Sequence, residues 1–508
     1  MKKTVFIKNA LILTASSLIL RFVGIIFKVW LAQLIGSEGI GLYQLVFSVY
    51  VLAATFATSG ICTAVTRLVA EELALGTKGG TLKILRRSIE LTLIIATVSV
   101  AVVFFGAEFI ADRFLGDMRA IPALKILPLS LPFMGITSCL RGYFIARRKA
   151  TPNAVSQLFE QAVRILIVVV LVKRFAHRGL AAACAAVLFG DTAAEICSCL
   201  MLGIIWLWDR KKLTALTGRE RPSYGIVRRI LHISLPITSG RYLNTALRTT
   251  ENILVPKNLA KYPHSGELAL SQFGMIKGMA LPILFFPSTL LNSISTLLIP
   301  EMSEAAAKGR NGLVRSATRN ILKLTAVMSF IFGAVFFFAG REIGLLIYKS
   351  EEVGELLRAL SPIVPLMYLD SVSDGILKGL DQQAFSFRTA ITDSTLRIIL
   401  ILIFLPVSGL GGFILIMYFS NLLTCALNVG RLIHISKARL KVINEIILPL
   451  GAALTITLLA DMILRLIPNI NNLVYLILIC LFSLPLYLIF IFLFGTVTVD
   501  DVKDFIKK

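Results

Sequence analysis

The chain has 508 residues, of which 56% are hydrophobic and 16% are charged, and its mean hydropathy is +0.83. Soluble globular domains carry about 25% charged residues, so this composition excludes an ordinary soluble protein. A net charge of +23 would suggest nucleic-acid binding in a soluble chain, but here the Lys and Arg residues lie mostly in alternate loops. We therefore expect these charges to meet membrane lipid headgroups, with no nucleic acid as a partner.

The apolar residues gather in about fourteen long runs, and a run of roughly 20 residues suffices to cross the ~30 Å hydrocarbon layer. We predict an all-α polytopic membrane protein with about 14 transmembrane helices. The expected spans are residues 9–35, 39–62, 88–107, 121–146, 152–172, 179–208, 230–256, 268–299, 321–340, 359–379, 384–405, 409–433, 443–465 and 472–495.

The basic residues predict the orientation of these spans. Cytoplasmic loops are enriched in Lys and Arg, and the alternate connections on the side of the N-terminus are the basic ones, above all residues 210–229. One short outer loop, with Lys173, Arg174 and Arg178, goes against this pattern. We predict that both termini are cytoplasmic.

An internal repeat relates the two halves of the chain at an offset of 232 residues. It matches Thr63 with Ser295, Glu72 with Glu304, Gly80 with Gly312, Lys83 with Arg315, Arg87 with Arg319 and Ile89 with Ile321, and farther on Arg164 with Arg397 at a slightly shifted offset. Apolar helices can resemble one another by chance, but the matched loop charges argue against chance. We predict a six-helix lobe over 1–215, a second over 216–440, and two further helices with a cytoplasmic tail over 441–508.

An even number of spans in each repeat leaves both lobes in the same orientation. Their pseudo-symmetry axis then runs along the membrane normal, and a substrate path lies between the lobes. The repeat therefore predicts alternating access.

Charged residues inside the spans are costly and mark candidate functional positions. In the first span Arg21, Gly24 and Lys28 share one helical face, and the seventh span, its equivalent in the repeat, carries a similar stripe. The residues expected to line a cationic cavity are Arg21, Lys28, Arg241, Arg248 and Lys277 as headgroup ligands, with Gln44, Asn244 and Glu251 in support. A structural alternative is that Arg21 and Lys28 extend to lipid headgroups while Arg248 pairs with Glu251.

Acidic residues inside other spans allow two interpretations. They are Glu160, Asp191, Glu195, Asp370, Asp374 and Asp393. The structural interpretation pairs some of them with Arg164 or Arg397, since a buried acid needs a partner. The functional interpretation is a proton or sodium coupling site at Asp370 and Asp374, which share a helical face. The sequence does not decide between the two.

Motifs of enzymes are missing from the sequence. There is no phosphate-binding G-x-x-x-x-G-K-[ST] loop, the four histidines lack metal-ligand spacing, and the seven cysteines form no C-x-x-C pair. The longest extramembrane segment, 208–229, is too short for a catalytic domain. We expect a transporter without cofactor or metal rather than an enzyme.

Three segments carry a resemblance to a known family. "SLILRFVGIIFKVWLAQLIGSEGIGLYQL", "SGICTAVTRLVAEELALG" and "LRGYFIARRKATPNAVSQLFEQAVRI" resemble the polysaccharide-exporter branch of the multidrug and oligosaccharidyl-lipid exporter superfamily, including its sporulation and lipid II flippase groups. The resemblance covers the whole chain. It implies a MATE-like fold of two six-helix lobes followed by two additional helices.

The family implies the flipping of an undecaprenyl-pyrophosphate-linked glycan across the bacterial cytoplasmic membrane, with cavity arginines holding the pyrophosphate. Arg21 and Gly24 match the first-helix pattern of lipid II flippases, but Phe27 stands where those proteins carry a second arginine. The second helix, "VLAATFATSG", also lacks their arginine. Lipid-linked glycan export is therefore the expectation, for cell-wall or spore-cortex synthesis, with cell-wall synthesis enzymes as conceivable partners.

Two other functions compete with this one. A cation-coupled multidrug exporter of the same superfamily would usually have twelve spans and an acidic cavity. A membrane scaffold for cell-wall enzymes would not need charges buried in equivalent helices.

Overall fold

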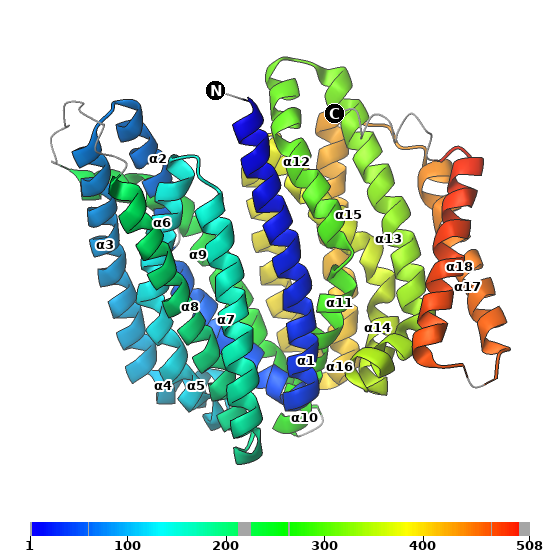
Figure 1. Ribbon diagram of the computed structural model, residues 1–508. Coiled ribbons are helices and arrows are strands. Elements are labelled where there is room, and N and C mark those ends of the chain that lie inside the picture. Colours follow the sequence, from blue (N-terminus) through cyan, green and yellow to red (C-terminus); the bar gives the residue numbers. More distant parts are fainter. Residues whose placement is uncertain (1–2, 59, 212–224, 263–264, 469, 497–508) are drawn as a thin grey trace. The chain divides into compact units, whose positions relative to one another are not determined.

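The computed structural model describes residues 3–58, 60–211, 225–262, 265–468 and 470–496, and within these ranges every regular element is a helix. The predicted all-α class is thus confirmed (Figure 1). The chain divides into two compact units, Met1–Lys257 and Asn258–Lys508, which we describe separately.

The first unit begins with two long helices and a shorter one between them. Its elements are α1 (Lys3–Thr58), α2 (Ile61–Ala74), α3 (Lys78–Phe105), α4 (Ala107–Phe109), η1 (Ile110–Leu115), η2 (Met118–Ala120), α5 (Ile121–Ile126), η3 (Leu127–Ser130), α6 (Leu131–Ala146), α7 (Thr151–Phe175), η4 (Ala176–Arg178), α8 (Leu180–Lys211) and α9 (Ile226–Leu259), the last ending just beyond the unit. Its core forms where Leu68, Leu140 and Tyr143 pack together from α2 and α6.

The second unit has a similar series of helices. Its elements are α10 (Gly266–Gly274), η5 (Met275–Ala280), α11 (Leu281–Phe285), α12 (Ser288–Ala307), α13 (Asn311–Tyr348), α14 (Glu351–Leu360), η6 (Ser361–Ile363), α15 (Val364–Gly379), α16 (Gln383–Ser436), η7 (Ile443–Ile447), α17 (Leu448–Arg465) and α18 (Asn472–Leu493). Helix α13 is the most buried of the long apolar helices described.

Two of these helices are interrupted by a glycine. Gly36 in α1 (φ 73°, ψ 176°) and Gly409 in α16 (φ 54°, ψ −137°) leave helical geometry, and glycine adopts positive φ without the steric cost of a Cβ. Each helix therefore comprises two segments, and we refer to residues 3–35 and 37–58 as the first and second segments of α1.

Ten described helical stretches are long and apolar enough to cross a membrane, and two of them contain the glycine interruptions at Gly36 and Gly409. The expected spans 230–256 and 359–379 are not among the ten. Helix α9 carries Arg241, Arg248 and Glu251, and α15 has only 16 residues. The multi-pass character is confirmed, whereas the count of fourteen spans stays a prediction.

The internal repeat is visible in the helix boundaries and in the packing. α6 (131–146) and α15 (364–379) start and end 233 residues apart, and each follows a 3₁₀ turn and has a proline at its second position. A Cβ added to Gly142 of α6 would lie 2.7 Å from the Cys62 carbonyl oxygen of α2, while one on Gly375 of α15 would lie 2.8 Å from Ser295 Oγ of α12. The same helix crossing thus occurs in both units, one residue away from the offset that the loop residues favour.

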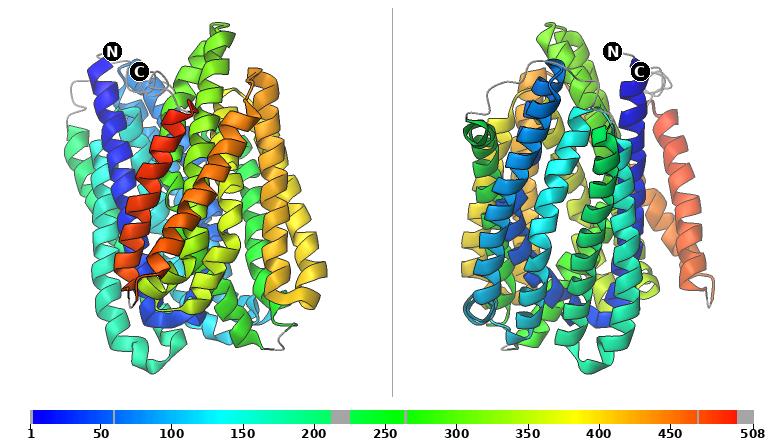
Figure 2. Two further views of the ribbon diagram at one scale, coloured as in Figure 1. Left: turned by 90° about the vertical axis from the view of Figure 1, so that its right-hand side faces the viewer. Right: turned by 60° about the vertical axis from the view of Figure 1, so that its left-hand side comes forward.

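The last two helices pack on the second unit. Ala452 and Ala453 of α17 and Ile491 of α18 form one apolar cluster with Val327 of α13, and the Tyr487 hydroxyl of α18 donates a 2.9 Å hydrogen bond to the Val327 carbonyl oxygen. Figure 2 (left) shows α17 and α18, in orange and red, side by side. These helices are therefore anchored to α13 by both apolar contact and a buried hydrogen bond.

Candidate functional site

The first segment of α1 carries a cationic stripe. Arg21 and Lys28 are both exposed, seven residues apart on one helical face. Neither forms a hydrogen bond or ion pair with another residue that the structure describes. Both cations are therefore available to an external anion.

Helix α9 carries the second stripe. Arg241 and Arg248 are exposed, and the Nε of Arg248 donates a 3.1 Å hydrogen bond to Asn244 Oδ1. Arg241 has no hydrogen-bond or ion-pair partner in the described part of the chain. Glu251, one turn farther on, is 3% exposed and engaged in an interaction of its own. The two arginines and Asn244 thus form an accessible polar face, and Glu251 lies inside.

Ser48 connects α9 to the second segment of α1. Its Oγ accepts a 3.0 Å hydrogen bond from Asn252 Nδ2, and its carbonyl oxygen accepts a 3.1 Å bond from Thr249 Oγ1. The predicted residue Gln44 is half-buried one turn before Ser48. The structure therefore brings the segment around Gln44 against α9 next to Arg248.

Closer to its start, α9 packs against α1 and α2. The Tyr242 hydroxyl donates a 3.0 Å hydrogen bond to the Phe56 carbonyl oxygen, and the two rings stack with centroids 4.3 Å apart. Gly60, with φ +75°, lies so close to α9 that a Cβ would be 2.4 Å from Thr238 Oγ1. Any larger residue at position 60 would force these helices apart.

Lys277 belongs to the second unit, on the π-helical turn η5, where it is half-buried and has an interaction partner. The structure brings Arg241, Asn244, Arg248 and Gln44 together in the first unit. It does not test whether Lys277 joins them.

The predicted coupling residues lie on α15. The Asp370 carboxylate accepts a 2.8 Å hydrogen bond from Asn428 Nδ2 of α16, and Asp374 forms an ion pair with Lys378 one turn away. Asp370 and Asp374 are both only partly exposed. Each therefore has a polar partner, and Asp370 also connects two helices.

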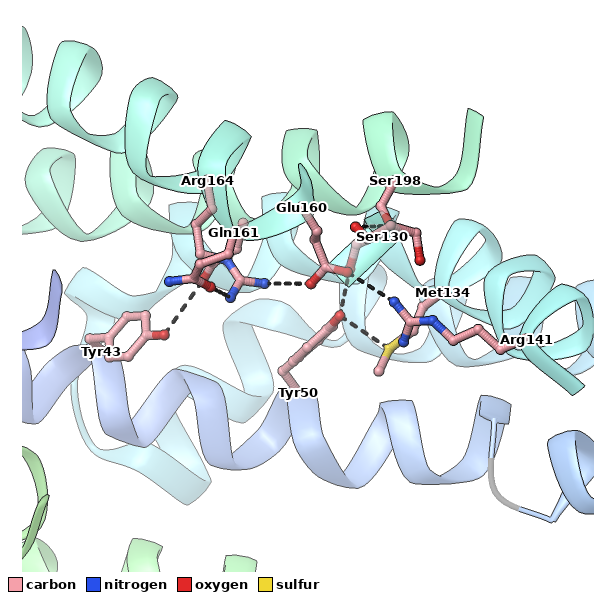
Figure 3. A network of polar contacts seen from close by, with 11 residues as sticks. Tyr43, Tyr50, Ser130, Met134, Arg141, Glu160, Gln161, Arg164 and Ser198 are labelled. Carbon is pink, nitrogen blue, oxygen red and sulfur yellow. Dashed lines mark hydrogen bonds and ion pairs between the residues drawn. The ribbon is translucent and has the colours of Figure 1, made fainter. Parts of the chain in front are cut away.

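Arg164 of α7 lies at the centre of a buried ion network (Figure 3). Its guanidinium is 3.0 Å from Glu160 on the same helix and 2.8 Å from Asp191 on α8. Arg141 of α6 reaches the other oxygen of Glu160 at 3.1 Å, so the network joins three helices. The interpretation of Glu160 and Asp191 as structural partners of Arg164 is confirmed.

Two tyrosines of α1 border this network. The Tyr43 hydroxyl is 3.5 Å from Asp191 Oδ2, and the Tyr50 hydroxyl is 2.8 Å from Ser130 Oγ and 3.5 Å from Met134 Sδ (Figure 3). The second segment of α1 therefore contacts α9 on one side and the ion network on the other.

Arg397 of α16 has a comparable but smaller set of partners. Its guanidinium lies 2.7 Å from Asp393, one turn before it, and donates a 2.6 Å hydrogen bond to Ser420 Oγ beyond the Gly409 interruption. Ser420 in turn donates to the Asp393 carboxylate. The proposed partnership of Arg397 with an acid is thus confirmed as well.

Ser48, Asn252 and Tyr43 were not predicted to take part. Ser48 is the one residue with a signal in the sequence, because a serine four residues after Gln44 continues a polar face through an apolar run. Tyr43 and Asn252 have no such signal, since their partners lie on other helices.

Comparisons with known proteins give a consistent result. Residues 6–305 match the family described as polysaccharide biosynthesis protein. Stage V sporulation protein B of Bacillus subtilis (strain 168) is 28% identical over 417 residues, which cover 81% of this chain and 80% of that protein. Lipid II flippase MurJ of the same organism is 22% identical over 418 residues, covering 78% of this chain and 76% of the relative.

Solved structures show the same fold. A structure described as lipid II flippase MurJ in an inward closed conformation superposes with a TM-score of 0.70 at 16% identity, covering 94% of this chain and 98% of its own. An inward-facing multidrug resistance MATE family transporter of the MOP superfamily gives 0.66 at 15% identity, with 82% and 94% covered. At these identities the likeness concerns the fold alone.

Proposed function

Because the chain belongs to the polysaccharide biosynthesis protein family, we propose that it is a flippase for an undecaprenyl-pyrophosphate-linked oligosaccharide or lipid II-like peptidoglycan precursor. The lipid carries its glycan from the inner to the outer leaflet of the bacterial cytoplasmic membrane, for cell-wall or spore-cortex synthesis. The names of the sporulation and lipid II flippase relatives support this substrate class.

One observation carries the proposal. Arg21, Lys28 and Arg241 are exposed cations within apolar helical segments, and none has a polar partner among the described residues. Such groups are costly in a membrane unless they face water or an anion. A pyrophosphate supplies the missing anion, since guanidinium groups bind its oxygens through two parallel, charge-assisted hydrogen bonds.

The remaining residues of the proposed site have supporting roles. Arg248, oriented by Asn244, adds a second guanidinium on α9, while Gln44 and Glu251 border it and Lys277 contributes from the second repeat. The lobes 1–215 and 216–440 then alternate access, across fourteen spans with both termini cytoplasmic. The polyprenyl tail stays in lipid, so that only the polar headgroup crosses.

Asp370 and Asp374 are the proposed coupling site for a proton or a sodium ion. The Asp370 carboxylate joins α15 to α16 through Asn428, so a cation bound there would change a contact between helices. The membrane potential is a second energy source, worth ~2.3 kcal/mol per elementary charge for each 100 mV.

The test is flipping of a fluorescent undecaprenyl-pyrophosphate glycan in reconstituted vesicles. We expect flipping by the wild type and a loss of at least tenfold in rate for Arg21→Ala and for Arg241→Ala. Arg388→Ala serves as the matched control, because Arg388 is another exposed, partnerless arginine within the described residues, at the start of α16. Thermal unfolding of each variant confirms that the fold is intact.

Two outcomes would overturn the proposal. Equal flipping by Arg21→Ala, Arg241→Ala and Arg388→Ala would remove the cationic faces from the mechanism. No flipping by the wild type, together with ion-dependent export of an organic cation, would instead identify a multidrug exporter.

A further inference from the structure

An open groove of about 510 Å³ lies between α2 and the first turns of α9, away from Arg241 and Arg248. We call it the α2–α9 groove. Its lining consists of Arg67, Leu68, Glu71, Gly225, Arg228, Arg229, His232 and Ile233. Three guanidinium groups thus surround one small space that contains a single carboxylate.

The carboxylate of Glu71 already neutralises part of this charge. It lies 3.2 Å from Arg67 Nε and 2.7 Å from Arg229, which fixes two of the three arginines in place. Arg228 and His232 are exposed and form no hydrogen bond or ion pair with the part of the chain that is described. The groove therefore keeps an uncompensated positive charge beside two pre-positioned guanidinium groups, an arrangement suited to a phosphate.

The residues that follow on α9 indicate where the phosphate comes from. Leu231 and Leu235 stand three and seven residues after Arg228, on the same helical face, and are 38% and 64% exposed. An exposed apolar stripe directly below a basic groove matches a phospholipid, whose headgroup is anionic and whose acyl chains are apolar. A freely dissolved phosphate would make no use of the leucines.

We propose that the α2–α9 groove binds the phosphate of an anionic phospholipid of the surrounding bilayer leaflet, with Arg228 as its principal ligand. The lipid bridges α2 and α9 at the end where Glu71 and Arg229 already join them. This site is separate from the headgroup ligands on α1 and the middle of α9. It does not depend on which lipid-linked glycan the protein carries.

Binding is measured with the purified full-length protein in phosphatidylcholine nanodiscs, by titration with a short-chain fluorescent phosphatidylglycerol. Arg228→Ala should weaken binding about tenfold, the effect expected for one lost charge-assisted contact. Arg228→Lys should retain most of the affinity, because the positive charge remains, and Arg388→Ala should match the wild type. A fluorescent phosphatidylcholine should not bind.

Competition identifies the source of the phosphate. Millimolar inorganic phosphate should fail to displace the fluorescent lipid, and undecaprenyl pyrophosphate should displace it no better than unlabelled phosphatidylglycerol does. Equal binding by Arg228→Ala and Arg388→Ala would overturn the proposal. Displacement by inorganic phosphate would reassign the groove to soluble anions, and preferential displacement by undecaprenyl pyrophosphate would make it part of the substrate path.

Discussion

Arg164 and Arg397 occupy equivalent positions of the repeat, 233 residues apart, yet their surroundings differ. Arg164 binds two carboxylates from two helices, and through Glu160 it is coupled to Arg141 on a third. Arg397 pairs with one carboxylate on its own helix and with a serine hydroxyl. The first unit therefore holds its helices together by charge where the second relies on one ion pair and a neutral hydrogen bond.

Substitutions at the positions around each arginine account for this difference. At the same offset of 233, Asp191 of the first unit corresponds to Thr424, and Thr137 corresponds to Asp370. The acid has thus moved from the helix that follows the arginine to the helix that precedes it. There Asp370 accepts a hydrogen bond from Asn428 and is not bound to Arg397. One repeat uses its extra acid for structure, and the other leaves its acid free for the proposed coupling role.

The largest effect is expected from Arg164→Ala. This variant leaves Glu160 and Asp191 buried with one cation fewer, and removal of one partner from a buried ion pair costs about 3–5 kcal/mol. Denaturant titration in mild detergent measures the loss in the free energy of unfolding. The triple variant Arg164→Met, Glu160→Gln, Asp191→Asn should recover part of it. A loss below about 1 kcal/mol in the single variant would show that the network is not structural.

Arg397→Ala should cost less, about 1.5–3 kcal/mol, the range for hydrogen bonds to charged groups. The Asp393 carboxylate keeps the hydroxyl of Ser420 as a donor, so it is not left without a partner. The same titration, run beside Arg164→Ala, measures the difference directly. Equal losses in the two variants would contradict the contrast between the units.

The equivalent helix crossings provide a third comparison. Gly142→Ala would place a methyl group 2.7 Å from a backbone oxygen of α2, which cannot move without shifting the helix, so we expect a cost of about 1–3 kcal/mol. In Gly375→Ala the nearest atom is Ser295 Oγ, which can rotate away, and the cost should stay below about 1 kcal/mol. Thermal unfolding of the two variants should rank them in this order. The reverse order would mean that the crossings are not equivalent.

The smallest effect is expected from Lys378→Ala. Lys378 pairs with Asp374, which occupies the position of Arg141 in the repeat, but the lysine side chain is 53% exposed. Exposed ion pairs one helical turn apart contribute about 0.3–0.5 kcal/mol. The variant should therefore unfold almost like the wild type. A loss above about 1 kcal/mol would indicate that Asp374 depends on this cation for stability.

The helical membrane fold was predictable from hydropathy alone, but two of the expected spans were not equally clear. Helix α9 carries Arg241, Arg248 and Glu251, which lower its hydropathy, and α15 is shortened by the proline-rich 3₁₀ turn before it. The repeat restores both, because each aligns with a recognisable helix of the first half. Periodicity within one sequence thus supplied what the individual segments lacked.

The candidate site was predictable only in part. A shared helical face is a local property, so the stripes of α1 and α9 could be read from the spacing of Arg21, Lys28, Arg241 and Arg248. Contacts between helices are not local. The sequence named Arg164 as a partner for nearby acids, but it could not show that Asp191 would be that partner or that Arg141 would share Glu160.

The hydrogen bonds of Ser48 to Thr249 and Asn252 also bear on how the protein is made. A helix with two arginines and a glutamate in its middle is a poor substrate for the translocon, since each such charge near the centre costs about 2.5–3.5 kcal/mol during insertion. Helix α9 emerges from the ribosome after α1 and finds there a surface with matching polar groups. We therefore expect α9 to enter the bilayer as a ward of α1, and truncated nascent chains that lack α1 to leave α9 outside the membrane.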